Sequence, residues 1–349
     1  MTADPVTDAV DAVAVAAWMD GAGLGAGRLE DLRPLPGGTQ NVMLRFRRSG
    51  RDYVLRRGPR HLRPRSNQNI LREITVVSAL ATTDVPHARL IAACTDPSVL
   101  GDAVFYLMEP VDGYNAAVEL PPRVAADAAE RHAMGLHAAR ALAVLGEVDP
   151  SAVGLDGFGK PDGFLERQVS RWIGELSSFS ELDGYAGPEL PGVDRLASWL
   201  EANRPPQGQT GILHGDYHLA NVMFTHGGPE IAAIVDWEMS TVGDPLLDLG
   251  ALLAVWPEAG DAPDLIGTAL SVAGGLPSEH ELIAEYARHS SRDLSALDWY
   301  AVLAAFKLGI VLEGTNARAQ AGMADPATGD RLHAHALALF GRALRRSAA

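Results

Sequence analysis

The strongest constraint on the fold comes from residues 212–238, where closely spaced polar residues border two short apolar runs. The chain reads Ile-Leu-His-Gly-Asp-Tyr-His-Leu-Ala-Asn-Val-Met-Phe from residue 212 and Ile-Val-Asp-Trp-Glu from residue 234. A Gly-Gly-Pro turn separates the apolar runs at 222–224 and 231–235, which predicts a β-hairpin. This hairpin would bring Asn221, before its first strand, near Asp236, after its second strand.

Carboxylates in this segment point to metal-assisted chemistry. Asp216 lies on the loop that leads into the predicted hairpin, and apolar residues flank the segment on both sides. Its carboxylates are therefore expected at the edge of a core, where burial is costly unless they are paired or bound to a metal. The arrangement that fits is one free carboxylate beside a Mg²⁺ site made of oxygen ligands.

The same pattern closely resembles the catalytic segment of the aminoglycoside phosphotransferase family of protein-kinase-like enzymes. That family carries H-G-D-x-H-x-x-N, a short hairpin, I-D-W/F-E and then G-D-P-x-x-D-L, which is matched here by Gly-Asp-Pro-Leu-Leu-Asp-Leu from residue 243. By this resemblance Asp216 is the general base or the residue that positions the acceptor hydroxyl. Asn221 and Asp236 are, on the same grounds, ligands of Mg²⁺. The resemblance implies ATP or GTP as donor and a hydroxyl-bearing small molecule as acceptor.

The fold class that the resemblance implies is α+β, with a small β-rich N-terminal lobe and a larger, mainly helical C-terminal lobe. We place the boundary at the Pro- and Gly-containing break after residue 109, so that the lobes comprise 1–109, including an N-terminal helix, and 110–349. Apolar patterns predict strands at 32–35, 42–47, 52–57, 89–93 and 104–108, and helices at 6–20, 67–80, 164–176, 193–203, 246–255, 279–290 and 299–319.

The expected nucleotide site lies in the N-terminal lobe. Gly38 and Thr39 belong to a turn that takes the place of the phosphate-covering loop of kinases, where backbone N–H groups can hold phosphate oxygens. Arg56 stands where kinases place their phosphate-contacting lysine, and its expected partner is Glu73 on the following helix. Arg57 remains an alternative to Arg56 because a shift of one residue exchanges the two faces of a strand.

The resemblance also implies that the adenine binds at the hinge between the lobes, at Met108, Glu109 and Val111. Two further features resemble the branch of the family whose kinase-like domain is found fused to acyl-CoA dehydrogenases. One is the strand ending in Val-Leu-Arg at residue 56, and the other is the helical segment 305–314.

Several roles stay open at the level of sequence. His218 either contacts the γ-phosphate or is structural, and Glu238 either reaches the metal or faces solvent. His214 and His218 could instead bind the metal of a hydrolase, although the neighbouring Gly-Asp and β-type run argue against the helix that this would need. A nucleotide-binding regulator without turnover is the other alternative, because an Arg replaces the usual Lys and the glycine loop is sparse.

Composition limits the partners. The 349 residues carry a formal charge of −15, which argues against binding of nucleic acid or of an anionic membrane. Cys94 is the only cysteine, so a disulfide within the chain is impossible and a reducing, cytoplasmic location is expected. No signal peptide and no membrane span are recognisable. The acceptor, the choice between ATP and GTP, and the oligomeric state do not follow from the sequence.

Overall fold

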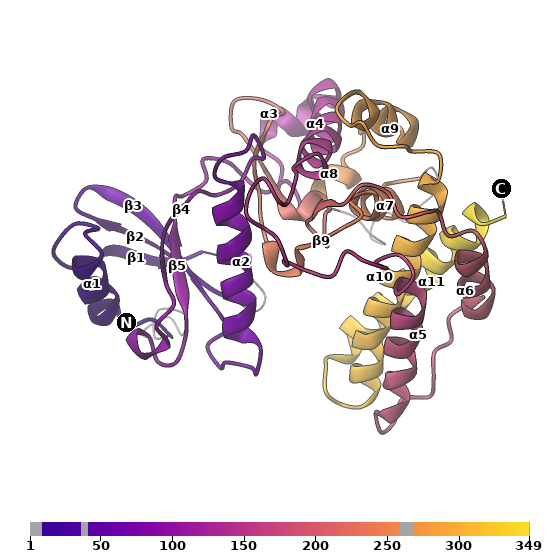
Figure 1. The fold of residues 1–349 in the computed structure, drawn as a ribbon, viewed down its shortest axis with the longest axis horizontal. Coiled ribbons are helices and arrows are strands. Elements are labelled where there is room, and N and C mark those ends of the chain that lie inside the picture. Colours follow the sequence, from indigo (N-terminus) through magenta and orange to yellow (C-terminus); the bar gives the residue numbers. More distant parts are fainter. Residues whose placement is uncertain (1–8, 36–40, 259–267, 349) are drawn as a thin grey trace. The chain divides into compact units, whose positions relative to one another are not determined.

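The computed structural model describes residues 9–35, 41–258 and 268–348, and the chain divides into two compact units. The first unit contains Met1–Gly113 together with Ala232–Ser240, and the second contains Tyr114–Ile231 and Thr241–Ala349. Each is described here by itself (Figure 1). The division differs from the expected boundary after residue 109 chiefly in the short return segment Ala232–Ser240, which carries Asp236.

Two backbone contacts attach this return segment to the first unit. The Ile234 amide donates to the Pro86 carbonyl at 2.8 Å. The Arg72 guanidinium donates to the Ser240 carbonyl at 2.9 Å. The segment therefore belongs with residues more than a hundred positions earlier in the chain, a pairing that local sequence patterns cannot reveal.

The first unit is built on a five-stranded antiparallel sheet with the order β1-β2-β3-β5-β4. Its strands are β1 (Glu30–Pro34), β2 (Val42–Arg48), β3 (Arg51–Arg57), β4 (Leu90–Cys94) and β5 (Phe105–Met108). The two-residue turn Ser49-Gly50 joins β2 to β3 with positive φ at both positions, the conformation that matches the twist of a hairpin. All five strands thus lie within a few residues of their predicted positions, and β3 is in the middle.

Helices cover the two faces of this sheet (Figure 1). Helix α1 (Ala12–Gly21) packs through Val15 and Met19 on the face that carries Leu55 and Leu107. Helix α2 (Ser66–Leu80) packs through Ile70 on the opposite face. Because side chains alternate along a strand, consecutive residues of β3 face different helices.

The second unit is mainly helical. Its helices are α3 (Pro122–Ala126), α4 (Ala128–Gly146), α5 (Gln168–Ser178), α6 (Val193–Ala202), α7 (Leu246–Ala254), α8 (Ala269–Val272), α9 (Glu279–Arg288), α10 (Leu297–Gln320) and α11 (Pro326–Arg346). The long helix α10 packs against α5, α6, α7 and α11, and Figure 1 shows α10 and α11 side by side. Most of α10 is buried, so it forms the centre of this unit.

Short strands frame the loop that carries the sequence motif. Strand β6 (Gly211–Leu213) pairs with β9 (Thr241–Gly243). The 3₁₀ turn Leu219–Asn221 leads into β7 (Val222–Phe224). The amide of Thr225 donates to the carbonyl of Glu230 at 2.9 Å and closes the predicted turn before β8 (Ile231–Ile234).

Some elements were not predicted. Strands β6 and β9 have three residues each, too few for a period of two to be recognised. Helix α11 was also missed, although Asp325 caps it and Pro326 occupies its first turn. Its sequence is also amphipathic, with Leu339 and Phe340 on the buried side, and the helix packs against α10.

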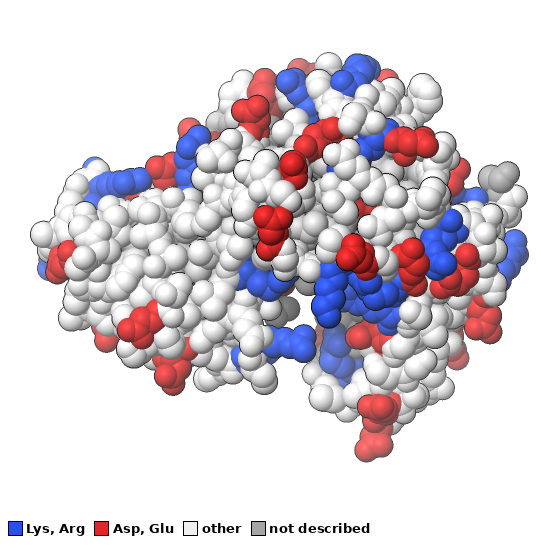
Figure 2. Space-filling view, in the orientation of Figure 1, with Lys and Arg blue, Asp and Glu red and all other residues white. Residues whose placement is uncertain are grey.

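In the view of Figure 2, acidic and basic side chains are interspersed over the second unit, whereas much of the visible face of the first unit is uncharged. In the stretches that the structure describes, no helix is both long and apolar enough to cross a membrane.

The packing of α7 on α10 generates a prediction about Gly250. A Cβ at this position would lie 2.5 Å from the Tyr300 carbonyl oxygen, and backbone atoms cannot move aside easily. We expect Gly250→Ala to lower the free energy of unfolding of the second unit by about 1–3 kcal/mol, measured by urea denaturation. Gly174→Ala is the matched control, because a Cβ at this position in α5 meets no atom within 4 Å. It should be neutral or stabilising, and equal losses for the two variants would contradict the packing argument.

Candidate active site

A buried ion-pair cluster occupies the centre of the first unit, with Arg56 of β3 at its core. The Arg56 Nε and Nη2 atoms donate to the two Glu73 carboxylate oxygens at 2.7 and 2.9 Å. Nη2 also donates to Asp236 Oδ1 at 2.7 Å. Tyr106, directly opposite Arg56 on β5, donates its hydroxyl to Glu73 Oε2 at 3.0 Å. One guanidinium therefore joins the sheet, helix α2 and the return segment.

Burial and charge act against each other in this cluster. Arg56 is 7% exposed and Glu73 is fully buried. Burial disfavours the charged guanidinium, but the carboxylate of Glu73 outweighs this effect and raises the pKa of Arg56 above its usual value. Burial and the adjacent Glu73 also raise the pKa of Tyr106 well above normal. Arg56 is consequently a permanent cation, and Tyr106 stays a neutral hydrogen-bond donor.

The alternation of β3 decides between the two arginines. Arg56 lies on the face of the sheet that packs against α2, and the predicted pair with Glu73 is present. Arg57 is on the other face, where its guanidinium donates to the carbonyls of Ala9, Gly58 and Pro59. Neither arginine is the exposed side chain of an edge strand. Arg57 is 4% exposed, so replacing it would disturb folding, and it cannot serve as a neutral control.

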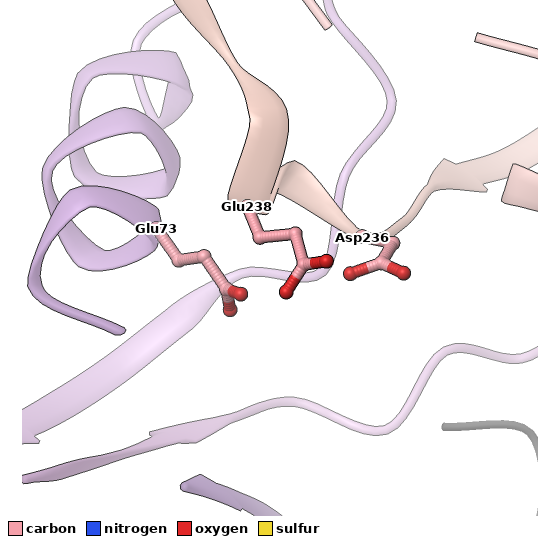
Figure 3. A group of neighbouring side chains, drawn as sticks. All are labelled: Glu73, Asp236 and Glu238. Carbon is pink, nitrogen blue, oxygen red and sulfur yellow. The ribbon is translucent and has the colours of Figure 1, made fainter. Parts of the chain in front are cut away.

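Three carboxylates converge beside Arg56. Glu73, Asp236 and Glu238 each place an oxygen atom within 4.8 Å of the others, and Figure 3 shows their side chains turned towards one another from α2 and from the segment after β8. Burial and the charges of Asp236 and Glu73 raise the pKa of Glu238. Hard oxygen ligands of this kind suit Mg²⁺, so the donor set fits the metal that the resemblance implies.

Asp236 itself has a backbone conformation that is uncommon for residues other than glycine. Its φ angle is +68°, in the left-handed region. The turn that follows β8 therefore redirects its side chain, and the ion pair with Arg56 fixes the carboxylate. Sequence reasoning identified Asp236, left Glu238 open and missed Tyr106. Tyr106 lies on a predicted strand, which was the available signal. The sequence did not predict that this strand would lie next to β3, opposite Arg56.

The second cluster lies in the second unit on the loop between β6 and β7. The Asn221 side-chain amide donates to the Asp216 carbonyl at 2.9 Å and to Asp216 Oδ2 at 3.1 Å. His218 Nε2 lies 3.5 Å from the same carboxylate oxygen. Burial alone would raise the pKa of Asp216, yet the hydrogen bond and charge of His218, with His214 and Lys307, lower it to about 2. Asp216 is thus ionised at neutral pH and half-exposed.

Buried groups from two helices hold this loop. Asp248 of α7 accepts hydrogen bonds from the amides of His214 at 2.6 Å and Gly215 at 2.9 Å. Lys307 of α10 donates its ammonium to the Gly215 carbonyl at 2.9 Å. Gly215 has a φ angle of +84°, which a residue with a Cβ would rarely adopt. Asp248 lies in the Gly-Asp-Pro-Leu-Leu-Asp-Leu match and Lys307 in the helical segment 305–314, but the sequence did not reveal the contact that either side chain makes with this loop.

The two histidines have backbone partners. His214 is fully buried and its Nδ1 accepts from the Asp216 amide at 3.3 Å. His218 Nδ1 accepts from the Ala220 amide at 3.2 Å and caps the 3₁₀ turn. Because the segment is a turn and not an α-helix, the two side chains are not on one helical face. Among the described residues, the carboxylate group that could hold a metal includes neither histidine.

Two adjoining cavities in the second unit border Asp216 and His218. The larger has a volume of about 240 Å³ and is lined chiefly by apolar residues from α7, from the segment that follows it and from α10, with Thr268, Ser271 and His335 as further polar groups. The smaller, about 40 Å³, is lined by Asp248 and Lys307 among others. Asp216 is therefore accessible from a space that can accept a small molecule.

The remaining predicted residues belong to the first unit. Gly38 and Thr39 lie outside the described residues. Met108 ends β5 and is largely buried, and the Glu109 amide donates to the Arg89 carbonyl at 2.9 Å. The Glu109 side chain is exposed and pairs with Arg51, and Val111 is partly buried. The Glu109 amide is thus engaged by a backbone contact within the first unit. Asn221 and Asp236, predicted as joint metal ligands, belong to different units.

A comparison with family models identifies the chain. The model described as the phosphotransferase enzyme family, APH, matches residues 31–300. This chain belongs to that family. The sequence-based assignment is therefore confirmed, and with it the expected fold of a sheet-rich N-terminal part and a helical C-terminal part.

Relatives among curated proteins come from the branch that the sequence indicated, in which the kinase-like domain is fused to an acyl-CoA dehydrogenase. The chain is 32% identical over 294 residues to acyl-CoA dehydrogenase family member 11 of Gallus gallus, which covers 82% of this chain and 36% of that protein. It is 29% identical over 298 residues to member 10 of Mus musculus, covering 83% of this chain and 27% of that protein. The chain thus spans about a third of the length of these relatives.

Solved structures share the fold. A Ralstonia eutropha protein described as a candidate aminoglycoside phosphotransferase is 30% identical, with a TM-score of 0.78, and the match covers 96% of this chain and 99% of that one. A thermostable mutant of aminoglycoside phosphotransferase APH(4)-Ia, crystallised with ADP and hygromycin B, has a TM-score of 0.62 over 95% of this chain and 98% of that one. Its identity is 14%, so this second likeness concerns the fold alone.

The buried cluster generates a prediction about Arg56. Arg56→Met would leave Glu73 buried without its partner, and loss of one member of a buried pair costs about 3–5 kcal/mol. Urea denaturation should therefore show a large loss of stability. The double variant Arg56→Met/Glu73→Leu should recover part of it, because no buried charge is left unpaired between these two positions.

Arg45→Met is the matched control. Its guanidinium pairs with Asp52 on the neighbouring strand, but both side chains are substantially exposed, so the effect should be small. A loss of stability for Arg56→Met no greater than that of Arg45→Met would show that the buried pair does not stabilise the unit.

Proposed function

We propose that this protein transfers the γ-phosphoryl group of ATP, or of GTP, to a hydroxyl group of a small molecule. The observation that carries the proposal is the loop around Asp216. Its carboxylate is ionised, is contacted by Asn221 and His218, and borders a cavity. Family membership supports phosphoryl transfer as the reaction class.

Asp216 would orient the acceptor hydroxyl towards the phosphorus atom. A carboxylate whose pKa is about 2 is a weak base, so positioning is a better account of its role than complete removal of the proton before attack. Asn221 holds the carboxylate through its amide hydrogens, which leaves its carbonyl oxygen as a possible metal ligand. His218, which caps the 3₁₀ turn and lies beside Asp216 and Asn221, would contact the transferred phosphate.

The proposed metal ligands are Asn221 and Asp236, with Glu238 as a further oxygen donor beside Asp236. Bound Mg²⁺ would offset the negative charge of the nucleotide phosphates. Asp236 presents one oxygen to Arg56, and its second oxygen is left for a metal. Glu238, whose pKa is raised, would be favoured in its charged form by a nearby cation.

Arg56 would supply the positive charge that kinases obtain from a lysine. Its Nε and Nη2 atoms bind carboxylates, whereas the contact of Nη1 among the described residues is with the weakly accepting Met43 sulfur at 3.6 Å. Nη1 is thus the donor that a phosphate oxygen would use. Backbone groups at Gly38 and Thr39 would cover the phosphates, and Met108, Glu109 and Val111 would border the adenine.

The larger cavity favours an acceptor with an apolar body. Its described lining is mainly apolar, and Asp216 is the carboxylate among its described lining residues. A polycationic aminoglycoside would need several carboxylates to balance its ammonium groups. A hydroxyl compound with an apolar chain or ring fits this lining better.

A regulator that binds nucleotide without turnover is the second candidate. The observation that favours it is the ion pair between Arg56 and Asp236, which engages a proposed metal ligand. Acceptor-dependent release of ADP in a screen of alcohols separates the two functions. Mg²⁺-dependent nucleotide binding with no turnover for any acceptor would favour the regulator.

Asp216→Asn should retain its fold and its nucleotide affinity while turnover falls at least about a hundredfold, which is a usual contribution of a positioned acid or base. The measurement is release of ADP with an acceptor found in the screen, together with circular dichroism. Asp183→Asn, at an exposed position, is the control and should be fully active. Near-normal turnover of Asp216→Asn would exclude the role assigned to this residue.

Asp236→Ala should abolish most of the gain in nucleotide affinity that Mg²⁺ gives the parent protein. Titration calorimetry measures the nucleotide affinity of each protein with and without Mg²⁺. Comparing the gain on adding Mg²⁺, instead of the affinity itself, separates metal binding from the loss of the contact with Arg56. Asp52→Ala removes a carboxylate from an exposed ion pair of the same unit and serves as control. The assignment fails if Asp236→Ala and the parent show the same gain.

A further inference from the structure

Lysine is rare in this chain. Lys and Arg total 29 residues, but lysine occurs only at positions 160 and 307. Lys160 lies on an exposed loop, whereas Lys307 belongs to the central helix α10 and lines the smaller cavity together with Asp216 and His218. Even the position where kinases carry a lysine is an arginine here. The presence of a lysine beside Asp216 therefore requires a local explanation.

The ammonium group of Lys307 fixes the residue that precedes Asp216. Its Nζ donates to the Gly215 carbonyl at 2.9 Å. On the other side of the same residue, Asp248 accepts from the Gly215 amide at 2.9 Å. The backbone of Gly215 is thus held at both its donor and its acceptor, by side chains from α10 and α7. Since Gly215 is in the left-handed region, these two contacts fix the direction in which the chain enters Asp216.

Lys307 is a buried cation that has carboxylates on one side and an aromatic ring on the other. Burial lowers the pKa of Lys307, and the carboxylates of Asp248 and Asp216 act in the opposite direction. On its other side, Nζ lies 5.7 Å from the centre of the Trp172 ring. An ammonium has three N–H donors, and one is used in the described hydrogen bonds. The other two are on a group that lines a cavity beside Asp216.

We propose that Lys307 is a positioning residue for the phosphoryl transfer proposed above: it holds the Gly215 carbonyl, sets the direction of the Asp216 carboxylate and presents its remaining N–H donors to the bound acceptor. The inference rests on the proposed function. A lysine suits this place because the cavity is only about 40 Å³ and the contact is with a single carbonyl oxygen. A planar guanidinium is bulkier and has a fixed donor fork.

Steady-state kinetics of three variants test the proposal. Lys307→Met removes the charge and the donors, Lys307→Gln keeps a neutral donor, and Lys307→Arg keeps the charge in a larger group. We expect kcat to fall at least about tenfold for Lys307→Met, as for a misplaced catalytic group, with the KM for nucleotide within about twofold of the parent. Lys307→Gln and Lys307→Arg should retain more activity than Lys307→Met. Lys160→Met is the matched control and should behave as the parent.

Hydrogen exchange of the amides at residues 214–217 provides a second measurement that needs no acceptor. It should accelerate in Lys307→Gln, while exchange in the sheet of the first unit stays unchanged. If Lys307→Met does not fold, the Gln and Arg variants decide the outcome by the same two measurements. Parent-like kcat, or unchanged exchange in the loop, would overturn the inference.

The two proposals can fail separately. Absence of turnover in the parent with every acceptor counts against the proposed function. Turnover in the parent that persists in Lys307→Gln and Lys307→Met counts against the role of Lys307 alone. If the Lys307 variants lost kcat and also showed a higher KM for nucleotide than the parent, Lys307 would act on the nucleotide. This result would also overturn its assignment to the positioning of Asp216.

Discussion

The guanidinium of Arg56 is the interaction on which the charged centre of the first unit depends. It lies between Glu73, which is fully buried, and Asp236, and the adjacent Tyr106 hydroxyl completes the hydrogen bonds of Glu73. Burial of the Glu73 carboxylate is tolerated because Arg56 and Tyr106 both donate hydrogen bonds to it. The same contacts attach the return segment to α2 and the sheet. The Arg56 guanidinium therefore both positions Asp236 and contributes to the stability of the unit.

An arginine changes what this centre can do compared with a lysine. Its fork binds Glu73 through two nitrogens and still reaches Asp236, which a single ammonium could do only with poorer geometry. The cost is that one Asp236 oxygen is already engaged. In the proposed reaction, metal and nucleotide would have to share the carboxylates with Arg56, and Glu238 supplies an additional oxygen for that purpose.

The loop that carries Asp216 in the second unit differs from this centre. Its backbone is held by more contacts than its functional side chain. Asp248 and Lys307 bind the peptide groups of residues 214 and 215, while the Asp216 carboxylate borders open space and is contacted by Asn221. A rigid backbone with a half-exposed carboxylate is suited to orienting a hydroxyl, because little freedom remains to be lost when the acceptor binds.

The sequence by itself determined the family, the fold class and the loop that carries Asp216, because these depend on fixed spacings within a short segment. The family pattern also favoured Arg56 over Arg57, whereas the period of two in β3 left both arginines open until the contact with Glu73 was known. Only the tertiary structure revealed the contacts between residues that are distant in the sequence. Tyr106 lies opposite Arg56, Asp248 binds the amide of His214 from 34 positions later in the chain, and Lys307 binds the carbonyl of Gly215 from 92 positions later. Helix α11 is a different case, because its cap and its amphipathic pattern are present in the sequence, and only its packing partner α10 depended on the tertiary structure. Local patterns record propensity and periodicity, whereas these contacts depend on which helices and strands meet, and that is set by burial over the whole unit.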